Sequence, residues 1–221
     1  MIWDWNYAFS ILPELLEHFF RYTVVLTILG TVVAASLGLV FAIVRWVKIP
    51  VLSQVTWAFI EFIRSTPIVI QLFFLFYALP NFGITLPAMT AAVIGFGVHY
   101  ACYYAEVYRA GITAVPVGQW EASTAVHLSP TRTWQRVILP QAVRNVLPSL
   151  GNYAIAMFKE TPYAALITVP ELVFEAKEVA STTSEYVEPL TMAGLIFLAA
   201  SYPTALLLRR LERHLETAPA A

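Results

Sequence analysis

Residues 22–44 read YTVVLTILGTVVAASLGLVFAIV, a run of 23 residues without a charged side chain that is bounded by Arg21 and Arg45. A helix rises 1.5 Å per residue, so a run of this length can cross a hydrocarbon core of roughly 30 Å. Of the 221 residues in the chain, 59% are hydrophobic and 12% are charged, whereas soluble domains carry about 25% charged residues. The sequence therefore predicts an all-α membrane protein.

A second charge-free run, residues 65–105, is too long for one crossing. Its middle, LPNFGITLP, contains Pro, Asn and Gly, which favour a turn between two spans. Two weaker apolar segments follow nearer the C-terminus. We expect one transmembrane domain over residues 1–221, with five crossings at about residues 22–44, 57–79, 87–108, 143–167 and 189–208.

The N-terminal stretch MIWDWNYAFSILPELLEHFF does not resemble a cleaved signal peptide, because Asp4 stands where a positive charge is usual. We expect it to form a short amphipathic helix at the membrane surface. The single cysteine, Cys102, excludes an internal disulfide, and we expect it to be buried. A net charge of −1 gives no broad basic field, so nucleic acid is not an expected partner.

The orientation follows from the distribution of Lys and Arg, which favour the cytoplasmic side of a membrane. With the N-terminus outside, most of the 13 positive residues face the cytoplasm and the C-terminus lies there as well. The cytoplasmic set is Arg45, Lys48, Arg64, Arg109, Arg132, Arg136, Arg144, Arg209, Arg210 and Arg213. The segment between the third and fourth spans, residues 116–142, is therefore predicted to be cytoplasmic.

That segment contains QWEASTAVHLSPTRTWQRVILPQAVR, which predicts two short helices and a corner. Glu121 is expected in the first turn of one helix, where a carboxylate interacts favourably with the helix dipole. This helix should stop near His127, because Ser129 and Pro130 are typical of an N-cap and a first helical residue. Pro140 is expected to break or bend the chain as it enters the fourth span. An ordinary cytoplasmic loop remains an alternative.

This segment resembles the EAA loop of permease subunits of bacterial ABC importers. That pattern is Glu-Ala-Ala, three residues, Gly, nine residues, Ile, one residue and Leu-Pro. The sequence has Glu121-Ala122-Ser123, then His127, Val137 and Leu139-Pro140 at the same spacing. His127 departs from the motif glycine. We expect it to be a tolerated helix C-cap, since His adopts positive φ more readily than most residues.

The resemblance extends to polar amino acid permeases of the histidine, glutamine and arginine type, and more loosely to ectoine or hydroxyectoine permeases. FIRSTPIVIQLFFLFYALP, YAEVYRAGITAVPVGQWEA and KETPYAALITVPEL are similar to segments of that family. Glu160, Pro162 and Tyr163 depart from its pattern. The resemblance implies a type I ABC importer permease fold in a bacterial cytoplasmic (inner) membrane. It also implies that the loop docks on an ATPase through residues Gly118, Trp120, Glu121, Ala122, Ser123, His127, Leu139 and Pro140.

The source of energy is expected to lie in another protein. None of the three lysines lies in a Gly-rich loop that ends in Gly-Lys-Ser/Thr, so this chain is not expected to hydrolyse nucleotide. The resemblance implies a dimer of cytoplasmic ABC ATPase subunits, a second permease subunit, either identical or a sister chain, and an extracytoplasmic substrate-binding protein. Lipid surrounds the spans, and no catalytic residue, metal or cofactor is expected in this chain.

Ionisable residues in or near the spans are candidates for a translocation path or gate, because they are costly in lipid. The candidates are Glu61, Arg64, His99, Lys159, Glu160 and Thr161. Several alternatives remain open. Glu61–Arg64 and Glu106–Arg109 fit ion pairs at i, i+3. His99 fits a hydrogen bond between packed helices, and the fourth span could end before Lys159.

Together these features predict the permease subunit of an ATP-driven importer for a small polar amino acid or a similar zwitterion, which includes ectoine-type solutes. An ion-coupled secondary carrier is one alternative, but it would favour internal repeats with broken helices at matching positions. An intramembrane protease is another, but the chain has no Gly-x-Ser-Gly site to act with His99.

Overall fold

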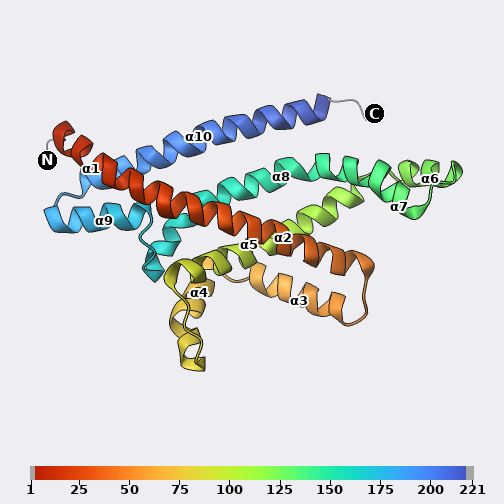
Figure 1. The fold of residues 1–221 in the computed structure, drawn as a ribbon, viewed down its shortest axis with the longest axis horizontal. Coiled ribbons are helices and arrows are strands. Elements are labelled where there is room, and N and C mark those ends of the chain that lie inside the picture. The colour runs from red at the N-terminus through yellow and green to blue at the C-terminus, as the bar shows by residue number, and fades with distance from the viewer. Residues whose placement is uncertain (1–2, 218–221) are drawn as a thin grey trace.

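The computed structural model describes residues 3–217, and every regular element in that range is a helix (Figure 1). The α-helices are α1 (Trp5–His18), α2 (Val25–Val47), α3 (Leu52–Arg64), α4 (Ile68–Phe73), α5 (Ala88–Thr113), α6 (Val117–Ala125), α7 (Pro130–Thr133), α8 (Leu139–Glu160), α9 (Leu172–Thr183) and α10 (Val187–Thr217). Three π-helical stretches are η1 (Phe19–Val24), η2 (Phe74–Ala78) and η4 (Trp134–Ile138), and two 3-10 helices are η3 (Leu79–Phe82) and η5 (Thr161–Ile167).

The first span belongs to one continuous helix, Trp5–Val47, which is 43 residues long. The prediction of a separate N-terminal helix at the membrane surface is therefore wrong. The π-helix η1 keeps the chain helical between α1 and α2. Ala8, Ile11 and Leu15 of α1 are buried in a core cluster with residues of α9 and α10. These contacts hold α1 in place as a continuation of α2.

The expected second span, residues 57–79, is not a single helix. Leu52–Arg64 and Ile68–Phe82 meet at a sharp bend of 105°, so the prediction of an unbroken span is wrong. The bend falls at Pro67, which has no N–H to donate to the preceding turn and disfavours helical geometry in the residue before it. In Figure 1 the segment Ile68–Phe82 leaves the bundle as an arm beside α5.

Helix α5 covers the expected third span and continues beyond residue 108 to Thr113. Its buried residues Phe96, Tyr100 and Tyr104 lie in the main core cluster with residues from α2, α8 and η5. Gly97 allows α5 to approach α2, because a Cβ at this position would lie 2.5 Å from Cγ1 of Val33. Small residues at such contacts are typical of packed membrane helices.

The expected fourth span also differs from the structure. A helical path runs from Pro130 through η4 into α8 without interruption, so the predicted break at Pro140 is wrong. The wide π-helical turn of η4 lies just before Pro140 and accommodates a residue without N–H. The α-helix then ends at Glu160 instead of near residue 167, and Pro162 lies in the first turn of η5.

The length and composition of the helices identify fewer membrane spans than the five predicted from the sequence. Among the described residues, Trp5–Val47 and Val187–Leu215 are long and apolar enough to cross a membrane, and the bent pair Leu52–Arg64 and Ile68–Phe82 adds a third if it counts as one span. The fifth predicted span therefore lies within the longer α10. α5 and α8 do not meet this criterion, so five crossings remain a prediction.

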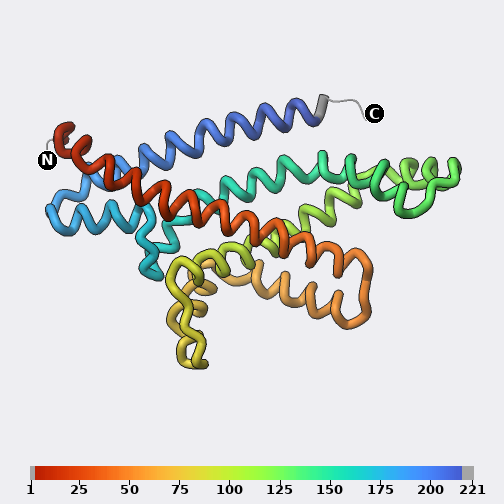
Figure 2. Tube along the Cα trace, viewed as in Figure 1, coloured from red at the N-terminus to blue at the C-terminus, as the bar shows by residue number. Residues whose placement is uncertain are grey.

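Apart from the arm that contains α4, the longer helices lie roughly along one direction, which places different elements at the two ends (Figures 1 and 2). The start of α1 and all of α9 lie at one end, which we call the α1–α9 end. α6, α7 and the last turns of α10 lie toward the other end, which we call the α6–α7 end. The first and last described residues are thus at opposite ends of the molecule (Figure 2).

Candidate functional site

The helix α6 presents the motif residues of the predicted coupling loop. It begins at Val117, directly after Pro116, so Glu121 lies in its second turn and the prediction of a first-turn position is wrong. The side chains of Glu121 and Ala122 are exposed, whereas that of Ser123 is 3% exposed and donates to the carbonyl of Gln119 at 2.7 Å. One face of α6 is therefore attached to the protein and another is open.

The corner after α6 has the geometry that the sequence predicts. His127 has a φ of 55°. Its N–H donates to the Thr124 carbonyl at 3.0 Å, and the Leu128 N–H donates to the Ser123 carbonyl at 3.0 Å. These two bonds form a Schellman motif, in which the residue of positive φ is usually glycine. The expectation that His127 serves as a helix C-cap is confirmed at the level of backbone geometry.

The second helix of the segment begins as expected. Ser129 has extended backbone angles and Pro130 is the first residue of α7. The Ser129 side chain makes no capping hydrogen bond, so its contribution is conformational. The local sequence therefore fixes a tight corner between α6 and α7.

Three tryptophans connect the segment to the bundle. Trp134 of η4 makes edge contacts with Trp120 of α6 at 5.3 Å and with Trp46 of α2 at 5.8 Å between ring centroids. A small cluster of buried Val115, Ile138 and Ala142 lies beneath them. The amide of Gln141 also donates to the Gln119 side chain at 3.3 Å.

The remaining motif residues lie on the surface of this end. Gly118, Leu139 and Pro140 are exposed. Val117 at the start of α6 is 70% exposed and Val126, directly after its end, is 67% exposed, so this end also presents apolar side chains. A surface of this kind, with one carboxylate and exposed apolar residues, suits a protein partner more than bulk water.

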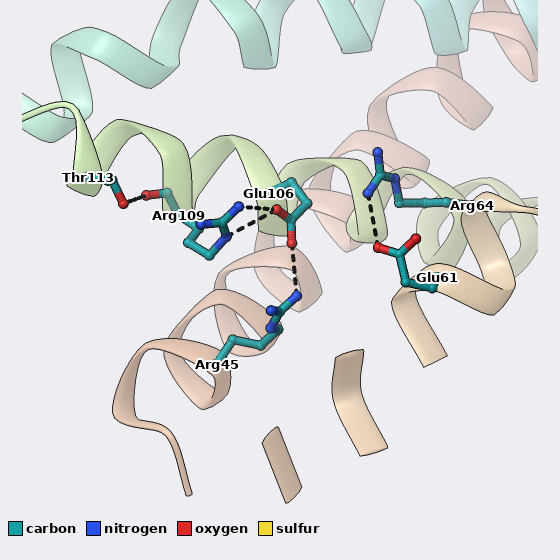
Figure 3. Close-up of polar contacts among 6 residues, drawn as sticks. All are labelled: Arg45, Glu61, Arg64, Glu106, Arg109 and Thr113. Atoms are coloured by element: carbon teal, nitrogen blue, oxygen red, sulfur yellow. Dashed lines mark hydrogen bonds and ion pairs between the residues drawn. The ribbon is translucent and has the colours of Figure 1, made fainter. Parts of the chain in front are cut away.

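Charged residues pair near the ends of α2, α3 and α5 (Figure 3). Arg64 Nη1 lies 3.5 Å from Glu61 Oε1, and Arg109 Nη2 lies 2.7 Å from Glu106 Oε2, as the i, i+3 spacing predicts. Arg45 of α2 also contacts Glu106, at 3.1 Å. The sequence analysis missed this third partner because no local spacing relates residues 61 positions apart.

A second polar cluster, which we call the tyrosine cluster, lies where α3, α5 and α8 meet. The Arg64 guanidinium lies over the Tyr103 ring, 5.3 Å from its centroid, and the Tyr100 hydroxyl donates to Glu160 at 2.9 Å. Tyr153 of α8 contacts the rings of Tyr100 and Tyr103. Arg64 and Glu160 thus contact the same group of tyrosines, although Tyr153 was not among the predicted residues.

The other predicted path residues have different environments. His99 is 8% exposed and its Nδ1 lies 3.2 Å from Oε1 of Gln71, which is the expected bond between packed helices. Thr161 is fully buried and donates to the Phe158 carbonyl at 2.8 Å. Lys159 is exposed at the end of α8. Gln71 was missed, although an amide within the apolar run 65–105 and away from its predicted turn is itself a signal.

Comparison with known proteins identifies the class of protein. Residues 34–217 match the family described as "Binding-protein-dependent transport system inner membrane component". A structure described as "Crystal structure of an amino acid ABC transporter with histidines" superimposes with a TM-score of 0.91 and 32% identity, over 97% of this chain and all of that chain. The fold is therefore that of a type I ABC importer permease.

Curated relatives agree over nearly the whole length. The "Probable amino-acid ABC transporter permease protein y4tG" of Sinorhizobium fredii is 41% identical, over 92% of this chain and 87% of the relative. The "Probable amino-acid ABC transporter permease protein PatM" of Vibrio harveyi is 40% identical, over 89% of each. The chain belongs to the family of inner-membrane permease components of binding-protein-dependent ABC transporters.

Proposed function

We propose that this chain forms the membrane path of an ATP-driven importer for a small polar amino acid or an amino-acid-like zwitterion, possible examples being ectoine-type solutes. The corner between α6 and α7 carries the proposal. It places the side chains of Glu121 and Ala122 on an exposed face of α6. Such a face offers a rigid contact through which a separate ATPase could move the permease.

Five crossings with the N-terminus outside form part of the proposal. The support is the excess of Arg and Lys at one end, since α7, η4 and the last turns of α10 carry Arg132, Arg136 and Arg209 at the α6–α7 end. In this orientation the α6–α7 end faces the cytoplasm and a dimer of ABC ATPases. The α1–α9 end faces a substrate-binding protein. A second permease subunit and surrounding lipid complete the assembly.

The tyrosine cluster is the proposed route for the solute. Arg64 and Glu160 carry opposite charges, and they contact Tyr103 and Tyr100 respectively. A zwitterion has a carboxylate that suits a guanidinium and an ammonium that suits a carboxylate. Half-buried Glu61 and exposed Lys159 lie close in the chain to Arg64 and Glu160 and would extend this route, while His99 and Thr161 are buried beside it.

The decisive experiment reconstitutes the chain in vesicles with its cognate ATPase and binding protein. Candidate amino acids and ectoine-type solutes are then tested for stimulation of ATP hydrolysis and for uptake. We expect one group of zwitterions to stimulate both activities, and neither activity without ATP. Uptake by the permease in the absence of an ATPase would instead support an ion-coupled carrier.

A further inference from the structure

The bend between α3 and α4 leaves backbone carbonyls without their usual helical donors. The Ile63 carbonyl would normally bond to the N–H four residues later, but that residue is Pro67, so it accepts the Thr66 N–H at 3.3 Å and the Phe62 carbonyl loses that donor. The Thr66 carbonyl loses the Ile70 N–H, which bonds to the Pro67 carbonyl at 3.0 Å instead. Such groups are costly in an apolar environment unless another donor reaches them.

Two side chains supply the missing donors. The Thr66 hydroxyl lies 3.2 Å from the Phe62 carbonyl and 3.1 Å from the Ile63 carbonyl. The Gln71 amide nitrogen lies 2.8 Å from the Ile63 carbonyl, 3.1 Å from the Thr66 carbonyl and 2.8 Å from the Thr66 hydroxyl. The angle of the bend is therefore fixed by hydrogen bonds.

The surroundings of Gln71 make these bonds important. Gln71 and Thr66 line a cavity of about 420 Å³ whose other walls are Phe59, Phe62, Ile63, Ile70, Phe74, Leu75, Ile94, Gly95 and Val98. An amide in such apolar surroundings is tolerated when its hydrogen-bonding groups are satisfied. All the acceptors of the Gln71 NH₂ group lie on the bend, whereas the Gln71 amide oxygen faces a different helix.

That helix is α5, and the partner is His99. The Gln71 amide oxygen can only accept, so His99 donates through Nδ1 over 3.2 Å. His99 also contacts the rings of Tyr100 and Tyr103, which bind Glu160 and Arg64. α5 ends at Thr113, four positions before α6 begins at Val117. One helix thus joins the exposed surface of α6 to the bend.

We propose that Gln71 is a positioning residue that ties the arm Ile68–Phe82 to α5, so that the arm follows α5 when a partner displaces α6. The inference rests on the proposed function, because it needs an ATPase to act on α6. The bonds to the bend keep the arm at a fixed angle, and the bond to His99 transmits the displacement. Gln71 itself does not need to touch the solute.

The test follows the accessibility of the arm in the complete transporter. Phe82 lies at the end of the arm and is 73% exposed, whereas the single native cysteine, Cys102, is fully buried. Phe82→Cys can therefore be labelled with a membrane-impermeant maleimide in vesicles, with and without trapped nucleotide. We expect the labelling rate to change by about fivefold or more between the two states.

His99→Phe removes the donor to Gln71 and retains an aromatic ring and the bonds across the bend. We expect this change, and Gln71→Met, to make the labelling rate independent of nucleotide and to reduce uptake more than ATP hydrolysis. Thr66→Val is the matched control, since it removes bonds within the bend and leaves His99 and Gln71 in contact. It should retain the response to nucleotide.

The outcomes separate this inference from the proposed function. If Gln71→Met does not assemble, His99→Phe alone decides, because the bend remains bonded in that variant. A nucleotide response in His99→Phe equal to that of the parent overturns the positioning role, as does a transporting parent whose arm never responds. A parent that neither takes up solute nor couples it to ATP hydrolysis contradicts the proposed function instead.

Discussion

The α1–α9 end and the α6–α7 end are held to the bundle by different kinds of contact. At the α1–α9 end, the Asp4 N–H donates to Glu188 at 3.1 Å and the Leu172 N–H donates to the Thr23 hydroxyl at 3.1 Å. These partners are 184 and 149 residues apart in the chain, and the side chains of Thr23 and Glu188 are buried. Distant segments are thus fixed to one another by one buried and one partly buried hydrogen bond.

At the α6–α7 end the contacts are shorter in sequence and closer to the surface. Gln119 and Gln141, which are 22 residues apart, share a partly buried bond, and Ser123 bonds within its own helix. Trp120 and Trp134 pack against each other and on the buried cluster of Val115, Ile138 and Ala142. The difference indicates that the α1–α9 end is fixed to the bundle. The α6–α7 end is a small rigid unit whose exposed face is available to a partner.

The largest effect is expected for Glu121→Lys, a substitution on the exposed face of α6. We expect a loss of solute-stimulated ATP hydrolysis and uptake of about tenfold or more, because charge reversal in a protein contact costs several kcal/mol. Membrane insertion should be unchanged. Glu185→Lys is the control, since Glu185 is also exposed but lies beside α9. Normal coupled transport in Glu121→Lys would contradict the proposed docking of α6.

The buried carboxyl group of Glu171, at the α1–α9 end, makes the stability of the folded protein depend on pH. Burial raises the pKa of Glu171 from 4.5 to about 7, although N–H bonds from Val173 and Phe174 oppose the rise. The folded protein therefore holds this proton more tightly than the unfolded chain. The stability present below about pH 4.5 is lost as the pH rises through about 7, by an amount on the order of 3 kcal/mol.

Glu171→Gln removes this titration and retains an oxygen that can cap α9. We expect its thermal unfolding midpoint to fall less than that of the parent between pH 4 and pH 8 in detergent. Parallel curves for the two proteins would show that Glu171 does not titrate in this range.

Removal of the buried hydrogen bond between Leu172 and Thr23 tests the attachment of the α1–α9 end more locally. Thr23→Val deletes the acceptor of the buried Leu172 N–H and should lower the free energy of unfolding by about 1–3 kcal/mol. Thr27→Val is the matched control, because the Thr27 hydroxyl donates to the Thr23 carbonyl within the same helix. Thermal unfolding and hydrogen exchange of α9 measure the difference. Equal losses in the two variants would argue against a special role for the long-range bond.

The smallest effect is expected at the corner of the α6–α7 end. His127→Gly should stabilise the segment by about 1 kcal/mol or less, because glycine adopts positive φ without a steric penalty. Transport should persist in this variant and in His127→Ala. A large loss of transport with normal assembly, in either variant, would assign His127 a role beyond the helix cap.

Much of the site could be predicted because its signals are local. The order Glu121, His127, Ser129 and Pro130 specifies a helix, a C-cap and a new helix start within a few residues, and the structure has this corner. The start of α6 was misplaced by about a turn, since the helix begins at Val117, directly after Pro116.

The sequence by itself determined the membrane class, the approximate helices and the corner at His127, because hydropathy and capping depend on neighbouring residues. The tertiary structure decided which distant groups meet. It extended the first span to Trp5, set the 105° bend, and brought Gln71 to His99 and Arg45 to Glu106. These contacts depend on how whole helices pack, and in an apolar bundle a lone polar group takes whichever partner the packing places within reach.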